Sequence, residues 1–232
     1  MHLTEIKSCY IGPQISPEQF VPEHFFLYLI KGTITGYDGH RKYTLTPGNY
    51  CMVRKNALAR YHKQKENGAF EKVVVILDEK FLKAFQKKHS PVMQLHRQKE
   101  AFLLLKKDKM IHEFIRSLAN DYNGEGKISE ALADVKREEL LLILLQQQPG
   151  LAGILFDFGQ PEKIDLADFM NHHYKFNVSI ERFAYLTGRS LSAFKRDFFA
   201  LFSETPGHWL TQKRLKEAYF LLEHTSVKPS EV

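Results

Sequence analysis

The spacing of apolar residues divides this chain into a strand-like first third and a helical remainder. Before residue 78 the apolar runs are short, rich in aromatic and β-branched residues, and separated by the turn pairs Asp38-Gly39 and Pro47-Gly48. Short strands between such turns predict an all-β barrel or sandwich. The clearest predicted strands cover residues 25–30 and 70–77.

From residue 78 onward the apolar positions recur every three or four residues, which predicts helices. The first of these helices carries Phe81, Leu82 and Phe85 on one stripe and lysines on its other side. Further helices are expected over residues 101–121, 129–148 and 162–174. The sequence therefore predicts an α+β protein with two domains, which cover residues 1–152 and 162–232 and are joined by a linker at 153–161.

Residues 179–214 predict a helix, a tight turn and a second helix. Ser179 and Ser190 are good N-caps, and Gly188 lies where a sharp turn requires a positive φ. The second helix, residues 191–202, has an apolar stripe that is expected to face the core and is made of Phe194, Phe198, Leu201 and Phe202. Its other side presents a small polar residue, two long cations and an aromatic ring, a pattern that suits the major groove of DNA, in Ser192, Lys195, Arg196 and Phe199.

At these residues the sequence resembles the DNA-binding domain of AraC/XylS-type transcriptional regulators. The residues that carry the resemblance are the helix start at 179–184 and Gly188, Ser190, Phe194, Phe198, Pro206, Trp209, Lys213, Arg214, Leu215 and Ala218. One departure is Ser203, which stands where the family usually has glycine. A second is the end of the chain at residues 229–232, where the family's second helix-turn-helix begins, so we expect a truncated DNA-binding domain.

The resemblance implies a sequence-specific regulator of transcription with a cupin-like N-terminal barrel and double-stranded DNA as partner. It implies DNA contacts at and around the second helix, from Arg189, Ser190, Leu191, Ser192, Lys195, Arg196, Phe199 and Lys213. In such regulators the barrel binds a small molecule, a regulatory protein or its own twin. The sequence leaves these alternatives open, although the barrel looks somewhat like that of type III secretion activators, whose partners are proteins.

An unbroken run of leucine and isoleucine occupies residues 140–145 of the predicted helix 129–148. A helix this apolar has to be covered on more than one side. Packing against its own barrel is one explanation, and a dimer interface is the other. The resemblance favours a homodimer, because family members often dimerise through helices beside the barrel; the expected dimer residues are Leu141, Leu144 and Leu145.

The positive charge of the chain is concentrated near the predicted helix-turn-helix. The net charge is +6 at pH 7, with 44% hydrophobic and 26% charged residues, which describes a soluble globular protein. Between residues 189 and 216 six basic residues accompany only Asp197 and Glu204. A local cluster of cations is what a positioned contact with an anionic partner needs.

Several other classes of protein are disfavoured. The chain has neither a run of eighteen apolar residues nor an apolar signal core, so a cytoplasmic protein is expected. Cys9 and Cys51 are expected to be reduced and inert. Catalytic motifs are missing, so no enzyme is predicted.

A cupin-type metal enzyme is the main enzymatic alternative. It needs histidines and a carboxylate that converge from adjacent strands. The candidates His24, His40 and His62 are far apart and are interpreted as surface or rim residues. His172 and His173 are adjacent and are also expected at the surface. No metal or cofactor is therefore expected, and a transcription factor is favoured over a partner-binding module and a cupin enzyme.

Overall fold

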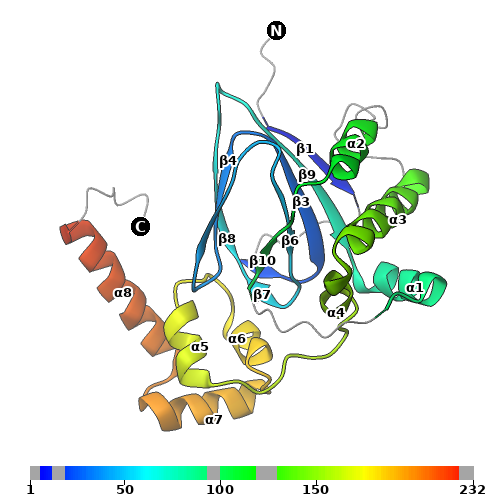
Figure 1. Cartoon of the computed structure of the whole chain (residues 1–232). Coiled ribbons are helices and arrows are strands. Elements are labelled where there is room, and N and C mark those ends of the chain that lie inside the picture. Colours follow the sequence, from blue (N-terminus) through cyan, green and yellow to red (C-terminus); the bar gives the residue numbers. More distant parts are fainter. Residues whose placement is uncertain (1–5, 12–18, 93–99, 119–129, 225–232) are drawn as a thin grey trace. The chain divides into compact units, whose positions relative to one another are not determined.

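The structure is a computed structural model that describes residues 6–11, 19–92, 100–118 and 130–224. The chain divides into two compact units, Met1–Gly159 and Gln160–Val232 (Figure 1). The first unit combines strands with helices, and the second is entirely helical where it is described. These are the α+β class and the two-part organisation that the sequence predicts.

The first unit, which we call the barrel domain, begins with strands and ends with helices. Its elements are β1 (Ile6–Ile11), β2 (Phe20–Val21), β3 (His24–Lys31), β4 (Thr33–Tyr37), β5 (Lys42–Leu45), β6 (Tyr50–Val53), β7 (Ala57–Leu58), β8 (Arg60–Gln64), β9 (Phe70–Leu77), α1 (Glu79–His89), β10 (Phe102–Leu104), α2 (Lys109–Leu118), α3 (Glu130–Gln147), the short 3-10 helix η1 (Pro149–Leu151) and α4 (Ala152–Leu155).

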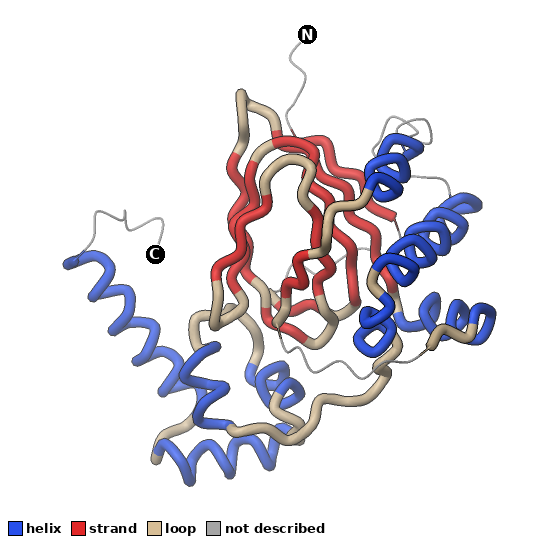
Figure 2. Tube along the Cα trace, viewed as in Figure 1, coloured by secondary structure: helices blue, strands red, loops and turns tan. Residues whose placement is uncertain are grey.

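The strands form a five-stranded sheet in the order β1-β9-β3-β6-β10, a three-stranded sheet in the order β5-β4-β8, and the small pair β2-β7. All neighbours are antiparallel except β1 and β9. The two larger sheets face each other around an apolar interior, and the helices lie on the outer side of the five-stranded sheet (Figure 2).

The five-stranded sheet is apolar on both faces. On β3, Phe25, Leu27 and Leu29 lie in the barrel interior, whereas Phe26 and Tyr28 pack towards the helices. Side chains of a strand alternate between the two faces, so a sheet covered on both sides has continuous apolar strands. This explains the unbroken runs at residues 25–30 and 73–77, which a one-sided sheet would not need.

One predicted helix is wrong over its first part. Residues 101–121 were expected to be helical, but Phe102–Leu104 forms the edge strand β10, and the helix covers Lys109–Leu118 in the described part of this range, which ends at residue 118. Phe102 pairs with Val53 of β6, and Leu103 pairs with Met52. The hydrogen bonds of an open sheet edge and the burial of Phe102 outweigh local helical periodicity in this segment.

Helix α3 is held to α1 by a buried arginine. Arg137 is 5% exposed, stacks over the ring of Phe81 at 4.1 Å from its centroid, and forms ion pairs with Asp78 and Asp134. Asp78 also caps α1 by accepting a hydrogen bond from the backbone N–H of Phe81. One carboxylate thus fixes both the start of α1 and the position of α3 beside it.

The linker between the two units is shorter than the predicted segment 153–161. Ala152–Leu155 forms helix α4, and Leu155 and Phe156 are buried in the same core as the helices of the barrel domain. The division between the two units falls after Gly159. None of the helices in the described part of the chain is long and apolar enough to cross a membrane.

In its described part, residues 160–224, the second unit has four helices: α5 (Leu166–His173), α6 (Ile180–Leu186), α7 (Leu191–Phe202) and α8 (Pro206–His224). Helix α5 begins later than predicted because Asp165 caps it, accepting a hydrogen bond from the backbone N–H of Asp168. His173 was expected at the surface but is buried between the rings of Phe169 and Phe176, whose centroids lie 4.2 and 5.7 Å away. Tertiary packing makes this histidine a core residue.

The three histidines considered for a metal differ in their surroundings. His24 was expected at the rim but is 1% exposed, and its Nδ1 accepts a hydrogen bond from the backbone N–H of Lys55 at 3.2 Å. His40 and His62 are exposed. Among the described residues no group of three or more histidine, cysteine, aspartate or glutamate side chains is arranged to hold a metal ion.

We predict that the barrel domain loses stability in mild acid because His24 is buried as a neutral imidazole. Desolvation, aided by the charges of Lys55 and Arg54, lowers the pKa of His24 to about 3. The unfolded chain takes up a proton near the ordinary pKa of about 6.5, whereas the folded chain does not. The free energy of unfolding should therefore fall by about 1.4 kcal/mol between about pH 7.5 and about pH 5.5.

Denaturant titrations at the two pH values measure this change. His24→Asn offers a similar hydrogen-bond acceptor without a titratable group and should remove most of the pH dependence. His62→Asn is the matched control at an exposed position, and its pH dependence of stability should equal that of the wild type. Wild-type stability that does not change over this range would contradict the prediction.

Candidate nucleic-acid interface

Helices α6 and α7 form the predicted helix-turn-helix. Ser179 caps α6 by accepting a hydrogen bond from the N–H of Arg182 at 3.2 Å, and Ser190 caps α7 from Ala193 at 3.3 Å. Both serines were predicted as caps, and both have the extended backbone that an N-cap requires. The side chain of Ser190 is therefore engaged in starting α7.

The turn between the two helices depends on Gly188. Its φ is +65°, and a Cβ at this position would lie 2.5 Å from the backbone nitrogen of Lys163. The segment before α5 thus crosses directly over the turn, and only a residue without a side chain leaves room for it. The sequence predicts the positive φ, but not the crossing segment.

Aromatic side chains fix the inner face of α7. Phe194 and Phe198 are fully buried, and the ring of Phe198 meets Trp209 of α8 edge-on with centroids 5.5 Å apart. Phe202 packs on the same Trp209 at 4.9 Å. Leu201 was expected in this stripe but is 56% exposed, and its neighbour Phe202 makes the contact with Trp209 instead. The orientation of α7 is therefore set by three phenylalanines.

Ser203 ends α7 in the left-handed backbone conformation, with φ of +55°. Its N–H donates to the carbonyl of Phe199 at 2.8 Å, which completes the last turn of the helix. A left-handed residue at this position is the geometry that glycine favours. Ser203 therefore forms the kind of turn that a glycine would form, although it departs from the family pattern.

The outer face of α7 is exposed along its length. Ser192, Lys195, Arg196 and Phe199 all reach the surface, and Phe199 is 55% exposed. We call these four residues the reading face. They lie one helical turn apart or closer, so they form one continuous strip on the side away from the aromatic core.

Arg189 does not belong to this strip, although it was predicted to contact DNA. Only 8% of its side chain is exposed, and its guanidinium donates to the carbonyls of Ile164 and Thr187 at 3.0 and 2.7 Å. A third hydrogen bond, 3.2 Å long, reaches Asp197 of α7. Arg189 therefore stabilises the turn from inside, because its Nε and Nη1 donate to groups of the protein.

Three other predicted contact residues lie near the reading face or on the next helix. Ser190 is exposed at the start of α7, and Leu191 is half-buried beside it. Lys213 belongs to α8, where its ammonium lies over the ring of Trp209 at 5.2 Å from the centroid. The structure thus keeps Ser190 and Leu191 at the N-terminus of α7, the end that a recognition helix presents to bases.

Two residues hold positions at this site that were not predicted from the sequence. Asp197 accepts hydrogen bonds from both Arg189 and Arg196. Arg214, counted among the cations of the motif, donates to the carbonyls of Tyr174 and Phe176 at 2.7 Å each and joins α8 to the end of α5. The adjacent pair Arg196-Asp197 could have indicated the ion pair of Asp197. No periodicity in the sequence indicates that the Arg214 side chain turns towards α5.

The predicted dimer residues of α3 are mostly part of the protomer's own core. Leu141 and Leu144 are 0% and 1% exposed and pack with the helices and sheet of the same domain. Leu145 is partly buried against the same core. The expectation that these residues meet a second chain is corrected, because the apolar outer face of the five-stranded sheet already covers them.

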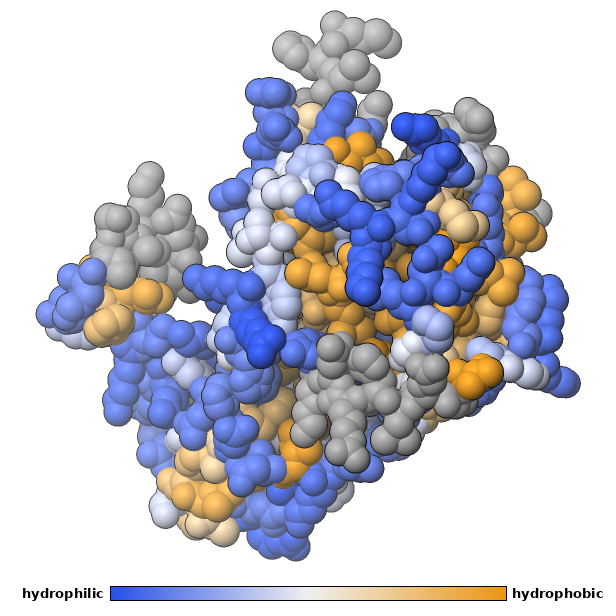
Figure 3. All heavy atoms as spheres, in the orientation of Figure 1, coloured by the Kyte–Doolittle hydropathy of each residue, from blue (hydrophilic) through white to orange (hydrophobic). Residues whose placement is uncertain are grey.

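A different set of apolar residues on α3 reaches the surface. Leu132, Val135 and Leu142 are 42%, 59% and 44% exposed. They are spaced by three and seven residues, so they form a stripe along one side of the helix, which we call the α3 stripe. Apolar side chains also emerge among hydrophilic ones on the face of the barrel domain shown in Figure 3.

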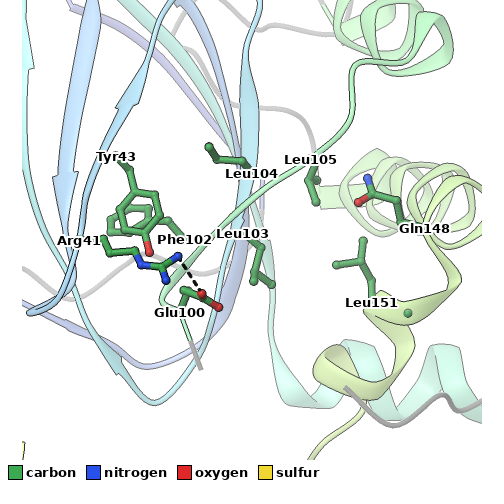
Figure 4. A pocket seen from close by; sticks show the side chains of 10 residues that line it. Arg41, Tyr43, Glu100, Phe102, Leu103, Leu104, Leu105, Gln148 and Leu151 are labelled. Carbon is green, nitrogen blue, oxygen red and sulfur yellow. Dashed lines mark hydrogen bonds and ion pairs between the residues drawn. The ribbon is translucent and has the colours of Figure 1, made fainter. Parts of the chain in front are cut away.

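The barrel domain contains a cavity of about 340 Å³ beside β10 (Figure 4). Its polar end holds Arg41, whose guanidinium pairs with Glu100 at 3.2 Å. Leu103, Leu105 and Leu151 supply apolar walls, and Gln148 adds an amide from the end of α3. Polar and apolar residues thus both line this cavity, which is open to solvent.

We predict that Gly188→Ala destabilises the helical unit by about 3 kcal/mol, because the new side chain combines a left-handed backbone with a clash against residues 162–163. Thermal unfolding followed by the fluorescence of Trp209 measures the loss. Gly207→Ala is the matched control, since its Cβ would meet only the Ile180 side chain at 3.9 Å. The substitution in helix α8 should be neutral or stabilising, and equal losses of stability from both changes would contradict the role assigned to Gly188.

Comparisons with known proteins show which family the chain belongs to. Residues 24–154, more than half of the chain, match the family described as the ExsA N-terminal regulatory domain. The virulence regulon transcriptional activator VirF of Yersinia enterocolitica is 24% identical over 200 residues, which cover 84% of this chain and 73% of VirF.

Two solved structures are more distant. The apo form of ToxT from Vibrio cholerae aligns with a TM-score of 0.45 at 12% identity, over 84% of this chain and 90% of that chain. The AraC-like transcriptional activator CuxR aligns with a TM-score of 0.28 at 14% identity, over 88% and 70%. On the match over residues 24–154, the chain belongs to the family of the ExsA N-terminal regulatory domain, and it is an AraC-type transcriptional regulator.

Proposed function

We propose that this regulator binds double-stranded DNA by inserting α7 into the major groove. The observation that carries the proposal is the reading face, an exposed strip whose opposite side is fixed by aromatic packing. Lysine and arginine recognise guanine through its O6 and N7 atoms, serine binds either kind of base pair, and an apolar ring contacts the methyl group of thymine. Lys195, Arg196, Ser192 and Phe199 match these roles.

The hydrogen bonds that the basic side chains make within the protein narrow the list of proposed DNA contacts. Of the six basic residues between positions 189 and 216, Arg189 and Arg214 donate to carbonyls within the protein. The base contacts are therefore assigned to Lys195 and Arg196. Ser190 and Leu191 line the groove at the start of α7, and Lys213 and Lys216 of α8 are left for phosphates.

The proposed role of the barrel domain is to join two chains through the α3 stripe. An exposed row of large aliphatic side chains is costly in a monomer, and closed two-fold symmetry is the commonest way to cover one. The row replaces Leu141 and Leu144 as the candidate interface, because these two leucines are buried within the protomer.

The charge pattern of the stripe favours an antiparallel pair of α3 helices. Glu139 lies in the same row between Val135 and Leu142, with its carboxylate 3.2 Å from the ammonium of Lys136. In a parallel pair Glu139 would face its own copy, which is repulsive. In an antiparallel pair centred on residue 137, Leu132 of each chain faces Leu142 of the other, and Glu139 faces Val135.

An effector is a second candidate role for the barrel domain, and the cavity beside β10 favours it. The ion pair of Arg41 and Glu100 at one end and the leucines at the other suit a small molecule with an apolar body and a polar group. Control by a protein partner is the alternative for the same domain. Occupation of the cavity would stabilise the domain against heat, whereas a protein partner would cover its surface.

Replacing Arg196 or Lys195 with alanine should relax the sequence preference of the regulator at one base pair. Each cation is expected to supply about 1–3 kcal/mol of discrimination for guanine. Binding titrations of the complete protein against a preferred duplex and its single-base-pair variants measure this effect. Lys80→Ala removes the same charge from an exposed position of α1, and it should leave the sequence preference unchanged.

Equal weakening on every duplex would instead identify Lys195 and Arg196 as phosphate contacts. In that case the salt dependence of binding would also become shallower, because fewer counterions are released. This outcome would remove base reading from the proposal and leave only nonspecific attachment.

For the barrel domain, Val135→Glu and Leu142→Glu should each give a folded protein of half the wild-type mass in light scattering. The new carboxylates lie at exposed positions, so they should break the α3 pair without a large loss of stability. Leu144→Glu is the matched change in the core and should cost at least ~4 kcal/mol by burying a charge. A wild-type monomer, or dimers of both surface variants, would contradict the assignment.

A further inference from the structure

The carboxylate of Asp197 connects two arginines of different exposure. Its Oδ2 accepts a hydrogen bond from Nε of Arg189 at 3.2 Å. Its Oδ1 accepts from Nε and Nη2 of Arg196 at 3.3 and 3.1 Å. The ammonium of Lys163 lies 4.0 Å from Oδ2. Asp197 is therefore the acceptor at the centre of a cluster of three cations.

One side of this cluster is rigid. The Arg189 side chain is 8% exposed and is anchored by the carbonyls of Ile164 and Thr187. A planar guanidinium held at several donors has little freedom left, so it fixes the carboxylate that it meets. The other side of the cluster, Arg196, is 77% exposed and belongs to the reading face.

We propose that Asp197 is a positioning residue that aims Arg196 at a guanine, an inference that rests on the proposed function of the reading face. Asp197 occupies the Nε–Nη2 edge of the guanidinium. The end of the guanidinium, with Nη1 and the second N–H of Nη2, points away from Asp197. That end matches the O6 and N7 acceptors of guanine in a bidentate contact.

The benefit of this arrangement lies in binding rather than in folding. An exposed ion pair contributes little to stability, because water and salt screen it. A long free arginine, in contrast, loses rotamer freedom when it binds a base, and holding it in place beforehand reduces that loss. The pairing with Arg196, followed by Arg189, holds the pKa of Asp197 below its usual range, so the carboxylate is charged at neutral pH.

The charge of Asp197 by itself disfavours DNA, which separates the proposal from simple electrostatics. Removing any acid close to α7 should strengthen binding to all duplexes, because repulsion from phosphates is reduced. Glu181 provides the matched control, since it is an exposed acid whose charge acts on Lys195 rather than on Arg196. Loss of guanine preference is expected only when Asp197 is changed.

The test uses a duplex selected from a randomised DNA library by the wild-type protein, and variants of it with each guanine replaced in turn. The wild type should discriminate about tenfold at the guanine read by Arg196. In Asp197→Asn the discrimination at this guanine should be no more than about threefold. In Glu181→Gln it should stay at the wild-type value. In the double variant R196A/D197N the preference should be no lower than in R196A alone, because both act through one contact.

The outcomes separate the two proposals. If R196A leaves every guanine preference intact, the proposed base reading by Arg196 fails and the role of Asp197 fails with it. If R196A removes a preference that D197N keeps or sharpens, base reading stands and the positioning role alone is overturned. Should D197N fail to fold, D197E keeps a charge for Arg189 but displaces the carboxylate by one methylene. The same loss is expected of it, and wild-type discrimination by folded D197E overturns the inference.

Discussion

The two apolar faces of the five-stranded sheet constrain the rest of the barrel domain. One face needs the three-stranded sheet to enclose the interior, and the other needs a layer of helices. Helices α1 to α4 supply that layer, which is why the leucine run of α3 turns inward. Burial of apolar area on both sides is the main stabilising contribution, and Arg137 with Asp78 selects how α3 meets α1.

The helical unit uses a different balance of forces. It is small, and aromatic contacts among Phe194, Phe198, Phe202 and Trp209 join α7 to α8. Its short helices are joined by hydrogen bonds from arginines to backbone carbonyls, which satisfy acceptors that turns leave open. Some of the basic residues that suggest DNA binding therefore hold the helices of this unit together instead.

The two units suit the division of work in a regulator. In the proposed function the helical unit presents a fixed strip to DNA, whereas the barrel domain has exposed residues on α3 and an open cavity beside β10 as candidate sites for a second chain or an effector. Joining two chains would bring two α7 helices to one DNA and raise the effective concentration of the second. Regulation at the barrel domain can then change DNA occupancy without altering α7.

Local sequence determined the caps Ser179 and Ser190, the positive φ of Gly188, the exposed strip of α7 and the strands at 25–30 and 70–77, because these follow from backbone preferences and periodicity. Only the tertiary structure decided which partner each side chain meets. Strand β10 exists because β6 has an open edge, and Leu144 is buried because a sheet lies under it. Arg189 points inward because the segment before α5 brings a carbonyl within reach, and such distant contacts leave no trace in local spacing.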